Sequence, residues 1–443
     1  MSAPDTLRVE LERLVRKEQA DKRLPSVAAA VVRDGEVVWD TAVGLADVEA
    51  DRAAAPDTQY RVGSITKTFT ATAVMQLRDE GKLGLEDTID RHLGDVAYRP
   101  TIRRLLSHMS GIQREPPGDV WETLDFGSAE DVLDILAEAE QVLPPGTRFH
   151  YSNLAFAVLG LLVERVSGKR YDEYLDERIF APLGMERTSL APSAPVAVGY
   201  LVHPYVDSVA EEAPVDTGGW VPAGQIWGTV RDLGRWASFL ADPDAAVLKR
   251  ETVEEMRVVQ TIDEHERWSS GYGLGLALRR EGERILAGHG GSMPGFMAML
   301  LVSPRDRIGA VTLTNGSTVS VEELARALVR TTIEQWPTGP EEWRAGDPVP
   351  IELEGVLGVW FLEGTEMVLR WRSGRLEATF PDLPDWAPPS VFAREGDDLY
   401  RTVSGREQGE RLRFVRDETG RVVKLLWATY PVTRDPRPFG SST

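Results

Sequence analysis

Strand-like segments stand at both ends of residues 1–336, with a long helical stretch between them. Two apolar or alternating runs come early, and Asp34-Gly35 between them is a strong two-residue hairpin signal. Further runs of strand period follow Gly271. The expected strands are 26–32, 36–42, 272–278, 284–287, 296–302 and 308–314. The simplest architecture is an α/β fold with one sheet built from both ends, mostly antiparallel because its connections are short, flanked by helices and carrying a helical insertion.

Beyond this region the character of the chain changes. Residues 321–336 are predicted to form a closing helix, and the stretch 337–350, rich in Pro, Gly and charge, is predicted to be a linker. Residues 351–443 hold seven or eight short strand-like segments separated by turns, which predicts a small closed antiparallel barrel. We therefore expect an α/β domain over 1–336, a linker, and a barrel domain over 351–443.

The charge and the residue types exclude several classes of function. The net charge of −20 argues against a nucleic-acid groove and against binding to an anionic membrane. The chain has no cysteine, so it offers no disulfide, no thiol nucleophile and no cysteine-ligated metal. Its six histidines show no metal-ligand spacing, and the acidic run around His265 is better explained as a solvated loop. We expect no metal and no cofactor.

The distribution of apolar residues along the chain allows a prediction of its cellular compartment. No stretch approaches the ~20 apolar residues that cross a bilayer. Residues 1–22 lack the apolar run of a signal peptide and instead carry Leu7, Leu11 and Leu14 at helical spacing. The prediction is a cytoplasmic protein without a membrane partner.

A serine followed three residues later by a lysine opens a predicted helix. Ser64 and Lys67 would lie on one face of that helix, close enough to meet. A serine hydroxyl becomes a nucleophile when a neighbour takes its proton, and a lysine can do so only when apolar surroundings keep it neutral. The N–H of Ser64, at the helix N-terminus, would also stabilise negative charge. On this motif alone, a serine near a helix cap remains the competing interpretation.

The second motif is Tyr151-Ser152-Asn153. Residues two apart in an extended loop point the same way, so Tyr151 and Asn153 would face one cavity. A tyrosine beside a cationic lysine can have a lowered pKa and pass protons. Asn153 can hold the lysine side chain or a substrate carbonyl. The competing interpretation is a buried tyrosine followed by a polar helix cap.

The third motif is Gly288-His289-Gly290-Gly291-Ser292, at the end of a predicted strand. Its glycines would let a substrate backbone approach the strand edge. The N–H of Ser292 would complete an oxyanion hole with that of Ser64. His289 would orient the Tyr151 hydroxyl or bind a substrate carboxylate. The competing interpretation is a glycine-rich turn with an exposed histidine.

Ser-x-x-Lys, Tyr-Ser-Asn and His-Gly-Gly, in this order, resemble the serine β-lactamase and penicillin-binding-protein superfamily. Within it, residues 24–336 are most similar to the class C β-lactamase-related serine hydrolases, which include esterases, D-aminopeptidases and D,D-carboxypeptidases. Supporting phrases are Thr-Ile-Arg-Arg-Leu-Leu-Ser-His from 101, Pro-Gly-Thr-Arg-Phe from 145 and Ala-Pro-Leu-Gly-Met from 181. The resemblance implies an α/β sandwich beside a helical region, with the site between them.

Roles for the motif residues follow from the resemblance. Ser64 would be the acylated nucleophile, Lys67 and Tyr151 would share the general acid/base work, and Asn153 would position substrate. His289-Gly290-Gly291 stands where members carry Lys-Thr-Gly or His-x-Gly. This departure favours an esterase or peptidase over a true β-lactamase.

A second departure concerns the pocket wall. Members often carry Ala-Gly-Gly where this chain has Ala223-Gly224-Gln225. Gln225 and Trp227 are therefore expected to shape the substrate pocket in an unusual way.

The expected function is acyl transfer through Ser64 on an ester, amide or thioester, with a substrate of D-amino-acid peptide character and hydrolysis as the outcome. One alternative is a penicillin-binding-protein-type thioesterase, which releases and cyclises nonribosomal peptides and also carries a lipocalin-like barrel. A second is a non-catalytic binding protein on the same scaffold. The expected partner is a small-molecule or peptidyl substrate, free or presented on a carrier protein.

Overall fold

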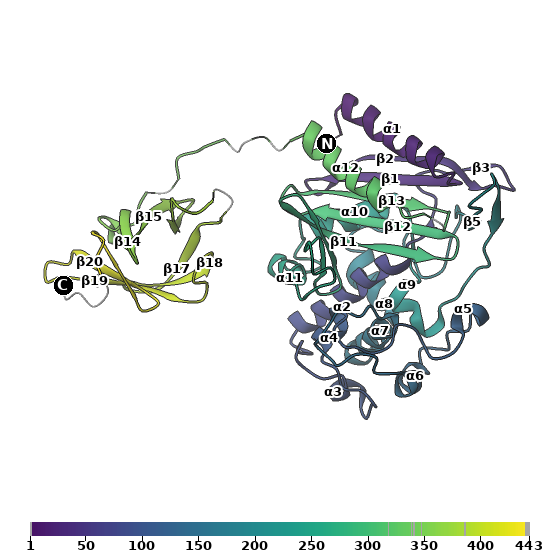
Figure 1. Cartoon of the computed structure of the whole chain (residues 1–443), viewed down its shortest axis with the longest axis horizontal. Coiled ribbons are helices and arrows are strands. Elements are labelled where there is room, and N and C mark those ends of the chain that lie inside the picture. The colour runs from purple at the N-terminus through teal and green to yellow at the C-terminus, as the bar shows by residue number, and fades with distance from the viewer. Residues whose placement is uncertain are drawn as a thin grey trace. The chain divides into compact units, whose positions relative to one another are not determined.

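The computed structural model describes residues 2–317, 319–337, 339, 342–346, 348–384 and 387–438. The chain divides into two compact units, Met1–Thr338 and Gly339–Thr443 (Figure 1). The first is built on one large antiparallel sheet with helices against it, and the second is a closed barrel. The predicted fold class is therefore confirmed.

The sheet of the first unit has nine strands in the order β3-β2-β1-β13-β12-β11-β10-β9-β8. The strands are β1 (Ser26–Arg33), β2 (Glu36–Asp47), β3 (Arg52–Ala53), β8 (Thr261–Ile262), β9 (Ser270–Tyr272), β10 (Ala277–Glu281), β11 (Arg284–Met293), β12 (Phe296–Ser303) and β13 (Ile308–Thr314). The early strand β1 pairs with the late strand β13, and the pair is antiparallel. The sheet is thus assembled from both ends of the unit, as the strand period predicted.

The first hairpin has the predicted turn. Arg33 pairs with Glu36, which leaves Asp34 and Gly35 as a two-residue loop. Both have positive φ, 50° and 87°, as a type I′ turn requires. A short polar residue and a glycine adopt this conformation at little cost, so the sequence fixes the register of β1 against β2.

Strand β1 explains why this sheet has two covered faces. Every residue of β1 is buried, and successive side chains point to opposite faces. Val27, Ala29 and Val31 pack with the outer helices α1 (Asp5–Asp21) and α12 (Glu322–Gln335). Figure 1 shows these two helices side by side along the outer face. Ala28, Ala30 and Val32 belong to the larger core that includes α10 (Val230–Ala241) on the opposite face.

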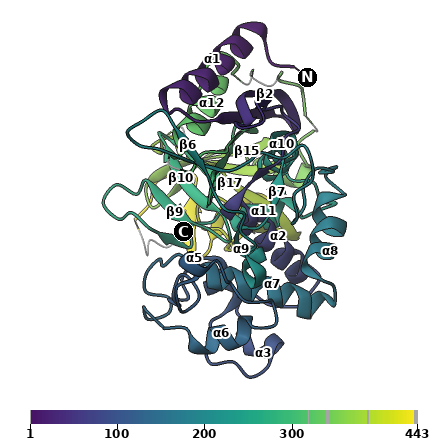
Figure 2. The same ribbon diagram turned by 90° about the vertical axis from the view of Figure 1, so that its right-hand side faces the viewer.

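The chain between the two halves of the sheet forms the helical region, below the sheet in Figure 2. Its helices are α2 (Thr66–Asp79), α3 (Asp90–Leu93), α4 (Ile102–Leu106), α5 (Val120–Thr123), α6 (Val132–Glu138), α7 (Asn153–Ser167), α8 (Tyr171–Leu175), α9 (Val221–Gly224) and α11 (Arg250–Met256). Three short helical turns are η1 (Gly63–Ile65), η2 (Asp176–Phe180) and η3 (Gly218–Trp220). There are also two small two-stranded sheets. One pairs β4 (Tyr60–Arg61) with β7 (Trp227–Gly228), and the other pairs β5 (Tyr200–Val202) with β6 (Val209–Glu211). Helix α7 is apolar nearly all round and is buried, as expected of such a helix.

The second unit is an eight-stranded antiparallel barrel that closes on itself. It comprises η4 (Ile351–Leu353) and the strands β14 (Gly358–Leu362), β15 (Thr365–Arg372), β16 (Arg375–Thr379), β17 (Ser390–Gly396), β18 (Leu399–Ser404), β19 (Arg411–Arg416), β20 (Val422–Trp427) and β21 (Tyr430–Thr433). Alternate side chains fill its interior, with Trp360 and Trp427 among the largest buried ones. Closure leaves no strand edge unpaired, and the predicted barrel is confirmed.

Three strands differ from the prediction, one of them being β2, which was expected to end near residue 42 and continues to Asp47. Residues 273–276, expected inside one strand, form the turn between β9 and β10, because Leu274 N donates to Met256 O and Gly275 N to Leu106 O. Strand β11, expected to end near residue 287, continues to Met293. The third motif therefore lies within a paired strand rather than after one.

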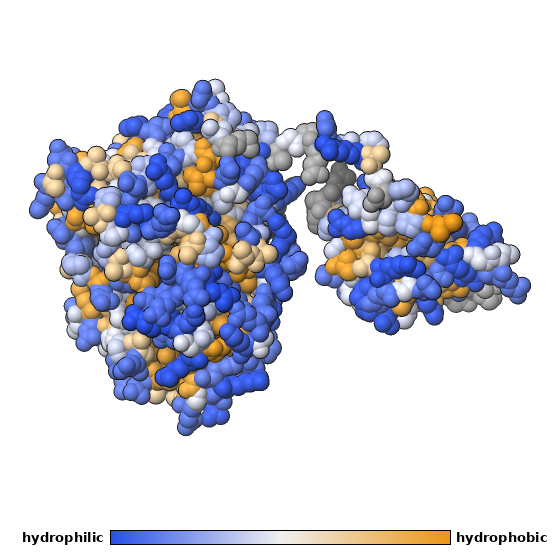
Figure 3. Space-filling view, turned by 180° about the vertical axis from the view of Figure 1, so that it is seen from behind, coloured by the Kyte–Doolittle hydropathy of each residue, from blue (hydrophilic) through white to orange (hydrophobic). Residues whose placement is uncertain are grey.

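Hydrophilic residues cover most of the face of the first unit seen in Figure 3, and hydrophobic ones are scattered among them. Within the described part of the chain, no helix has both the length and the apolar character needed to cross a membrane.

One buried amide joins three segments of the first unit. Asn315, directly after β13, accepts hydrogen bonds from Ser26 N at 2.8 Å and Ser26 Oγ at 2.6 Å through its Oδ1. Its Nδ2 donates to Leu45 O at 3.1 Å and Val198 O at 3.0 Å. The side chain therefore satisfies buried backbone groups from β1, β2 and the segment before β5.

We predict that Asn315→Ala lowers the free energy of unfolding by about 2–4 kcal/mol, because it leaves these backbone groups without partners. Urea unfolding followed by tryptophan fluorescence measures the loss. Val9→Ala is the control, because Val9 is 72% exposed on α1 and its truncation should change stability by no more than about 0.5 kcal/mol. Equal unfolding midpoints for the two variants would contradict this account.

Candidate active site

Ser64 lies at the join between the sheet side and the helical region. It sits in the single turn η1, directly before α2, and Lys67 follows in the first turn of that helix. Lys67 Nζ is 3.1 Å from Ser64 Oγ, so the two groups meet as helical spacing predicted. Lys67 is fully buried between α2, α7 and α9, whereas Ser64 lines an open cavity.

The surroundings of the Lys67 amine define its protonation state. Burial lowers the pKa of Lys67 well below its usual value near 10.5. Nζ donates to Asn153 Oδ1 at 2.7 Å and to the backbone oxygen of Ala223 at 2.7 Å. A neutral amine has two N–H donors and one lone pair. In this form, which burial favours, the two donors reach these carbonyl oxygens and the lone pair can accept the Ser64 hydroxyl proton.

Tyr151 lies on the other side of the serine. The Ser64 side chain lies near the Tyr151 hydroxyl and acts against the rise that burial causes in the Tyr151 pKa, and Lys67 Nζ is 4.9 Å from the ring centre. Burial raises the pKa of Tyr151 above its usual value near 10. The expectation of a tyrosine pKa lowered by a lysine cation is therefore wrong, because Lys67 is buried and its neutral form is favoured. The neutral phenol of Tyr151 is therefore favoured, and it can both donate and accept a hydrogen bond.

Asn153 holds the lysine from the start of α7. The preceding Ser152 caps this helix, since its Oγ accepts from Ala155 N at 3.0 Å. Asn153 Oδ1 receives Lys67, and Nδ2 donates to Glu115 Oε1 at 2.6 Å. The two partners fix which way the amide is turned. The sequence suggested that Asn153 holds either the lysine side chain or a substrate carbonyl. The structure shows that it holds Lys67.

A glycine of the third motif allows the backbone of β11 to lie close to the backbone of η1. A Cβ on Gly291 would lie 1.9 Å from Val62 O and 3.2 Å from Ser64 N, and one on Gly63 would lie 2.6 Å from Ser292 N. Strand β11 and the turn η1 can therefore pack backbone to backbone only because both positions lack a side chain. The contact brings Ser292 N beside the start of the Ser64 turn, and both serines line one cavity.

His289 occupies a different place from the one expected. Nδ1 is hydrogen-bonded with Gly290 O, so it carries the proton, and Nε2 accepts from the Tyr272 hydroxyl at 2.9 Å. Burial lowers the pKa of His289 to about 3, so the ring is neutral. The expectation that His289 orients the Tyr151 hydroxyl or binds a carboxylate is not met, because its nitrogens are engaged elsewhere and it carries no charge.

The cavity in front of Ser64 has a volume of about 530 Å³. Its lining comprises Ser64, Arg114, Glu115, Trp121, Phe126, Asn153, Thr217, Trp220, Ala223, Gly224, Ser292, Met293, Pro294 and Ser317. Sequence reasoning missed the charged pair Arg114-Glu115 and the aromatic residues of this wall. No local pattern marks them, because they reach the site through loops whose course depends on tertiary packing.

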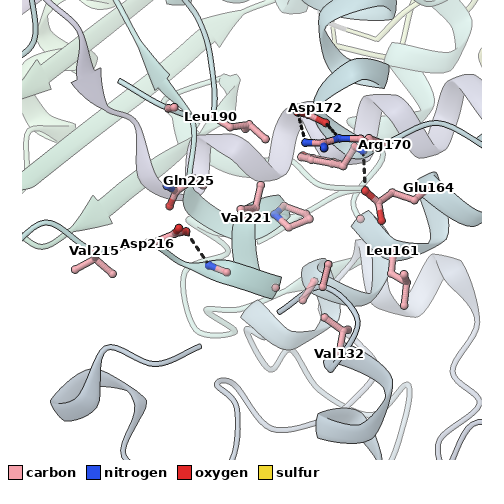
Figure 4. Close-up of a pocket in the computed structure, with 18 of the residues that line it drawn as sticks. Val132, Leu161, Glu164, Arg170, Asp172, Leu190, Val215, Asp216, Val221 and Gln225 are labelled. Carbon is pink, nitrogen blue, oxygen red and sulfur yellow. Dashed lines mark hydrogen bonds and ion pairs between the residues drawn. The ribbon is translucent and has the colours of Figure 1, made fainter. Parts of the chain in front are cut away.

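Gln225 and Trp227 face a neighbouring cavity instead. This second cavity, of about 750 Å³, is shown in Figure 4 with Gln225 at its edge. Gln225 Oε1 accepts from the Arg61 guanidinium and from Thr217 Oγ1, and the same guanidinium lies 5.6 Å from the centre of the Trp227 ring. Contrary to the prediction, neither residue lines the cavity of Ser64, although Gln225 is hydrogen-bonded to Thr217, which does line it. Arg61, unnoticed in the sequence, contacts both of them.

Within the described residues, no group of three or more His, Asp or Glu side chains is arranged to hold a metal ion.

Family models match parts of both units. A family model described as Beta-lactamase matches residues 11–332, and a domain of unknown function (DUF7586) matches residues 349–434. Penicillin-binding protein 4 of Amycolatopsis lactamdurans is 31% identical over 378 residues, which cover 78% of this chain and 95% of that protein. Beta-lactamase-like protein 2 of Dictyostelium discoideum is 30% identical over 264 residues, 56% of this chain. The chain spans about half of the length of this relative, 48%.

Solved structures support the same fold. The octameric penicillin-binding protein homologue from Pyrococcus abyssi is 23% identical with a TM-score of 0.67, over 97% of this chain and 100% of that one. SurE is 25% identical with a TM-score of 0.61, over 97% and 98%. A D-stereospecific amidohydrolase from Streptomyces sp. is 25% identical with a TM-score of 0.62, over 76% and 100%.

We predict that Gly291→Ala lowers kcat by about 100-fold or more, because its methyl group would push Ser292 N away from the Ser64 turn and disrupt the oxyanion hole. The measurement is the steady-state hydrolysis of an activated ester. Gly290→Ala is the matched control, since its Cβ would meet only the flexible end of Met299 at 3.0 Å, and its loss should be at least tenfold smaller. Equal losses would show that the close contact at Gly291 does not set the rate.

Proposed function

The chain belongs to the β-lactamase family, and we propose that it is a serine hydrolase that carries the acyl part of its substrate on Ser64. The observation that carries this proposal is the position of the Lys67 amine, buried and held by two carbonyl oxygens with its remaining hydrogen-bonding direction toward Ser64 Oγ. Such an arrangement supplies a general base to a serine without a histidine.

In the acylation step, Ser64 Oγ attacks the substrate carbonyl carbon while its proton moves to Lys67 Nζ. The negative charge that forms on the carbonyl oxygen is stabilised by the N–H groups of Ser64 and Ser292. The bond to the leaving group then breaks. The leaving group takes its proton from the Tyr151 hydroxyl, which is replenished by Lys67, so the base returns to its neutral form.

In the deacylation step, a water molecule attacks the acyl-Ser64 carbonyl and gives its proton to the same base. The ester bond to Ser64 breaks, and the hydroxyl recovers a proton through Lys67. Acceptance of the proton is transient, since the buried site disfavours the ammonium form of Lys67.

We propose an ester, amide or thioester of D-amino-acid peptide character as the substrate class. The similarity to a D-stereospecific amidohydrolase supports this class, and the aromatic cavity wall suits an apolar acyl group.

In the second candidate reaction, the acyl group on Ser64 is transferred to an amine instead of water, as in thioesterases that cyclise peptides. The SurE structure resembles this chain over both units, and a further SurE structure contains D-Leu. In this version the substrate would be a peptidyl thioester presented on a carrier protein. A non-catalytic binding role is the third reading, and the intact set of Ser64, Lys67 and Tyr151 disfavours it.

We predict that a fluorophosphonate adds its mass to Ser64 in peptide mapping. The labelling rate should rise with pH and level off well below pH 10.5, because only neutral Lys67 accepts the proton and burial lowers its pKa. Lys67→Met should slow labelling by about 10²–10⁴-fold and remove this pH dependence. Lys82→Met, at an exposed lysine, is the control and should label like the wild type. Label at another residue with Ser64 intact would reject the proposal.

The acceptor is tested with a linear peptidyl thioester that ends in a D-residue. Hydrolysis to the linear acid is the expected product, resolved from a macrolactam by mass spectrometry. A cyclic product formed by the wild type and not by Ser64→Ala would establish the amine acceptor instead. A ligand bound equally well by wild type and Ser64→Ala, with no turnover of any ester or thioester, would favour the binding role.

A further inference from the structure

Glu115 presents an unused hydrogen-bond acceptor at the cavity of Ser64. Its carboxylate lines this cavity, and Oε1 accepts from Asn153 Nδ2 at 2.6 Å. The second oxygen, Oε2, is buried and has no hydrogen-bond partner among the residues that the structure describes. A buried carboxylate oxygen without a donor is costly, so this position suits a ligand that brings one.

The position of Glu115 relates it directly to the reacting groups. Asn153 donates to Glu115 with its nitrogen and accepts from Lys67 with its oxygen, so one amide separates the carboxylate from the base. Ser64, Asn153 and Glu115 line the same cavity, so a substrate bound at Ser64 shares that cavity with the carboxylate.

The nearby cations of the protein leave Oε2 free. Arg114 Nε lies 3.4 Å from the other oxygen, Oε1, and its guanidinium is 4.9 Å from the centre of the Tyr151 ring. The Arg114 side chain is 60% exposed, so solvent weakens this ion pair. Lys67 uses its two donors on Asn153 and Ala223. Glu115 Oε2 thus has no cationic partner among the described residues.

An apolar wall completes the cavity. The rings of Trp121 and Phe126 meet edge to face at 5.1 Å between centroids, and Trp220 lines the same cavity from η3. Trp220 is almost fully buried, and its indole nitrogen also has no partner among the described residues. This combination favours a ligand with a bulky apolar group beside a charged donor.

We propose that Glu115 binds the α-ammonium group of the acyl donor, whose apolar side chain lies against Trp121, Phe126 and Trp220. The acyl group transferred to Ser64 is then an amino acid with a free amino group and an apolar side chain, or the N-terminal residue of a peptide. This assignment rests on the proposed serine hydrolase function and narrows its substrate. The three N–H groups of an ammonium can satisfy Oε2 in a charge-assisted hydrogen bond.

The test compares three methyl esters that share a phenyl side chain and a leaving group. The first is phenylalanine methyl ester, tested as both enantiomers, which carries the α-amine. The second, methyl 3-phenylpropionate, has no group in that position. The third, the monomethyl ester of benzylmalonate, carries a carboxylate there. At a pH where the amine is protonated, the wild type should prefer one phenylalanine ester over methyl 3-phenylpropionate in kcat/KM. Glu115→Gln keeps an oxygen for Asn153 but removes the charge, and it should lower this preference about 10–100-fold.

Glu122→Gln is the matched control, because Glu122 is an exposed carboxylate on α5 outside the cavity lining. It should leave the preference unchanged. An unchanged preference in Glu115→Gln overturns the assignment, and so does a wild type that prefers the benzylmalonate ester, which would point to a carboxylate bound by Arg114.

A second readout separates this assignment from the proposed function. Phenylalaninol has the amine and side chain but no acyl group, and calorimetry should show that it binds the wild type at least tenfold more tightly than it binds Glu115→Gln. If no ester is hydrolysed and Ser64 is not labelled, the proposed function fails, while the phenylalaninol result still decides the role of Glu115. Equal binding to both proteins overturns that role.

Discussion

The buried amine of Lys67 is the constraint on which the first unit depends. An amine can lie inside a protein only if it is neutral or fully paired, and here two carbonyl oxygens from different segments receive its N–H groups. One belongs to Asn153 at the start of α7 and the other to Ala223 in α9. The packing of α2 against α7 and α9 is therefore also what sets the direction of the lone pair. In the proposed mechanism, the packing of the helical region and the activation of Ser64 would both depend on this contact.

The second requirement is that the sheet reaches the serine. Strand β11 and the turn η1 touch through Gly291 and Gly63, where any side chain would collide with backbone. The N–H of Ser292 and that of Ser64 come together at this point, although they are far apart in the sequence. In the proposed acyl transfer, the helices would hold the base, and the strand would supply a donor for the developing negative charge.

Behind Tyr151 lies a layer of neutral, buried polar rings. His108 packs at 4.3 Å between centroids against Tyr151 and at 4.7 Å against Tyr272, which in turn bonds His289. Burial lowers the pKa of His108 and raises the pKa of Tyr272. Charge is thus kept out of the interior behind the phenol. The ionisable side chains of Glu115 and Arg114 lie instead at the wall of the Ser64 cavity.

The sequence by itself determined the elements and the spacings within them. Alternation predicted the strands of the sheet and the barrel, Asp34-Gly35 fixed a hairpin, and a separation of three residues placed Lys67 beside Ser64. These are local properties, because the side-chain period of a helix or strand follows from its own backbone. Tertiary structure decided which polar groups became partners and which lost contact with water. Only folding could turn His289 to Tyr272, hold Gln225 on Arg61, keep Tyr151 protonated and bring Glu115 to the cavity, because hydrogen-bond partners and desolvation depend on segments that are distant along the chain.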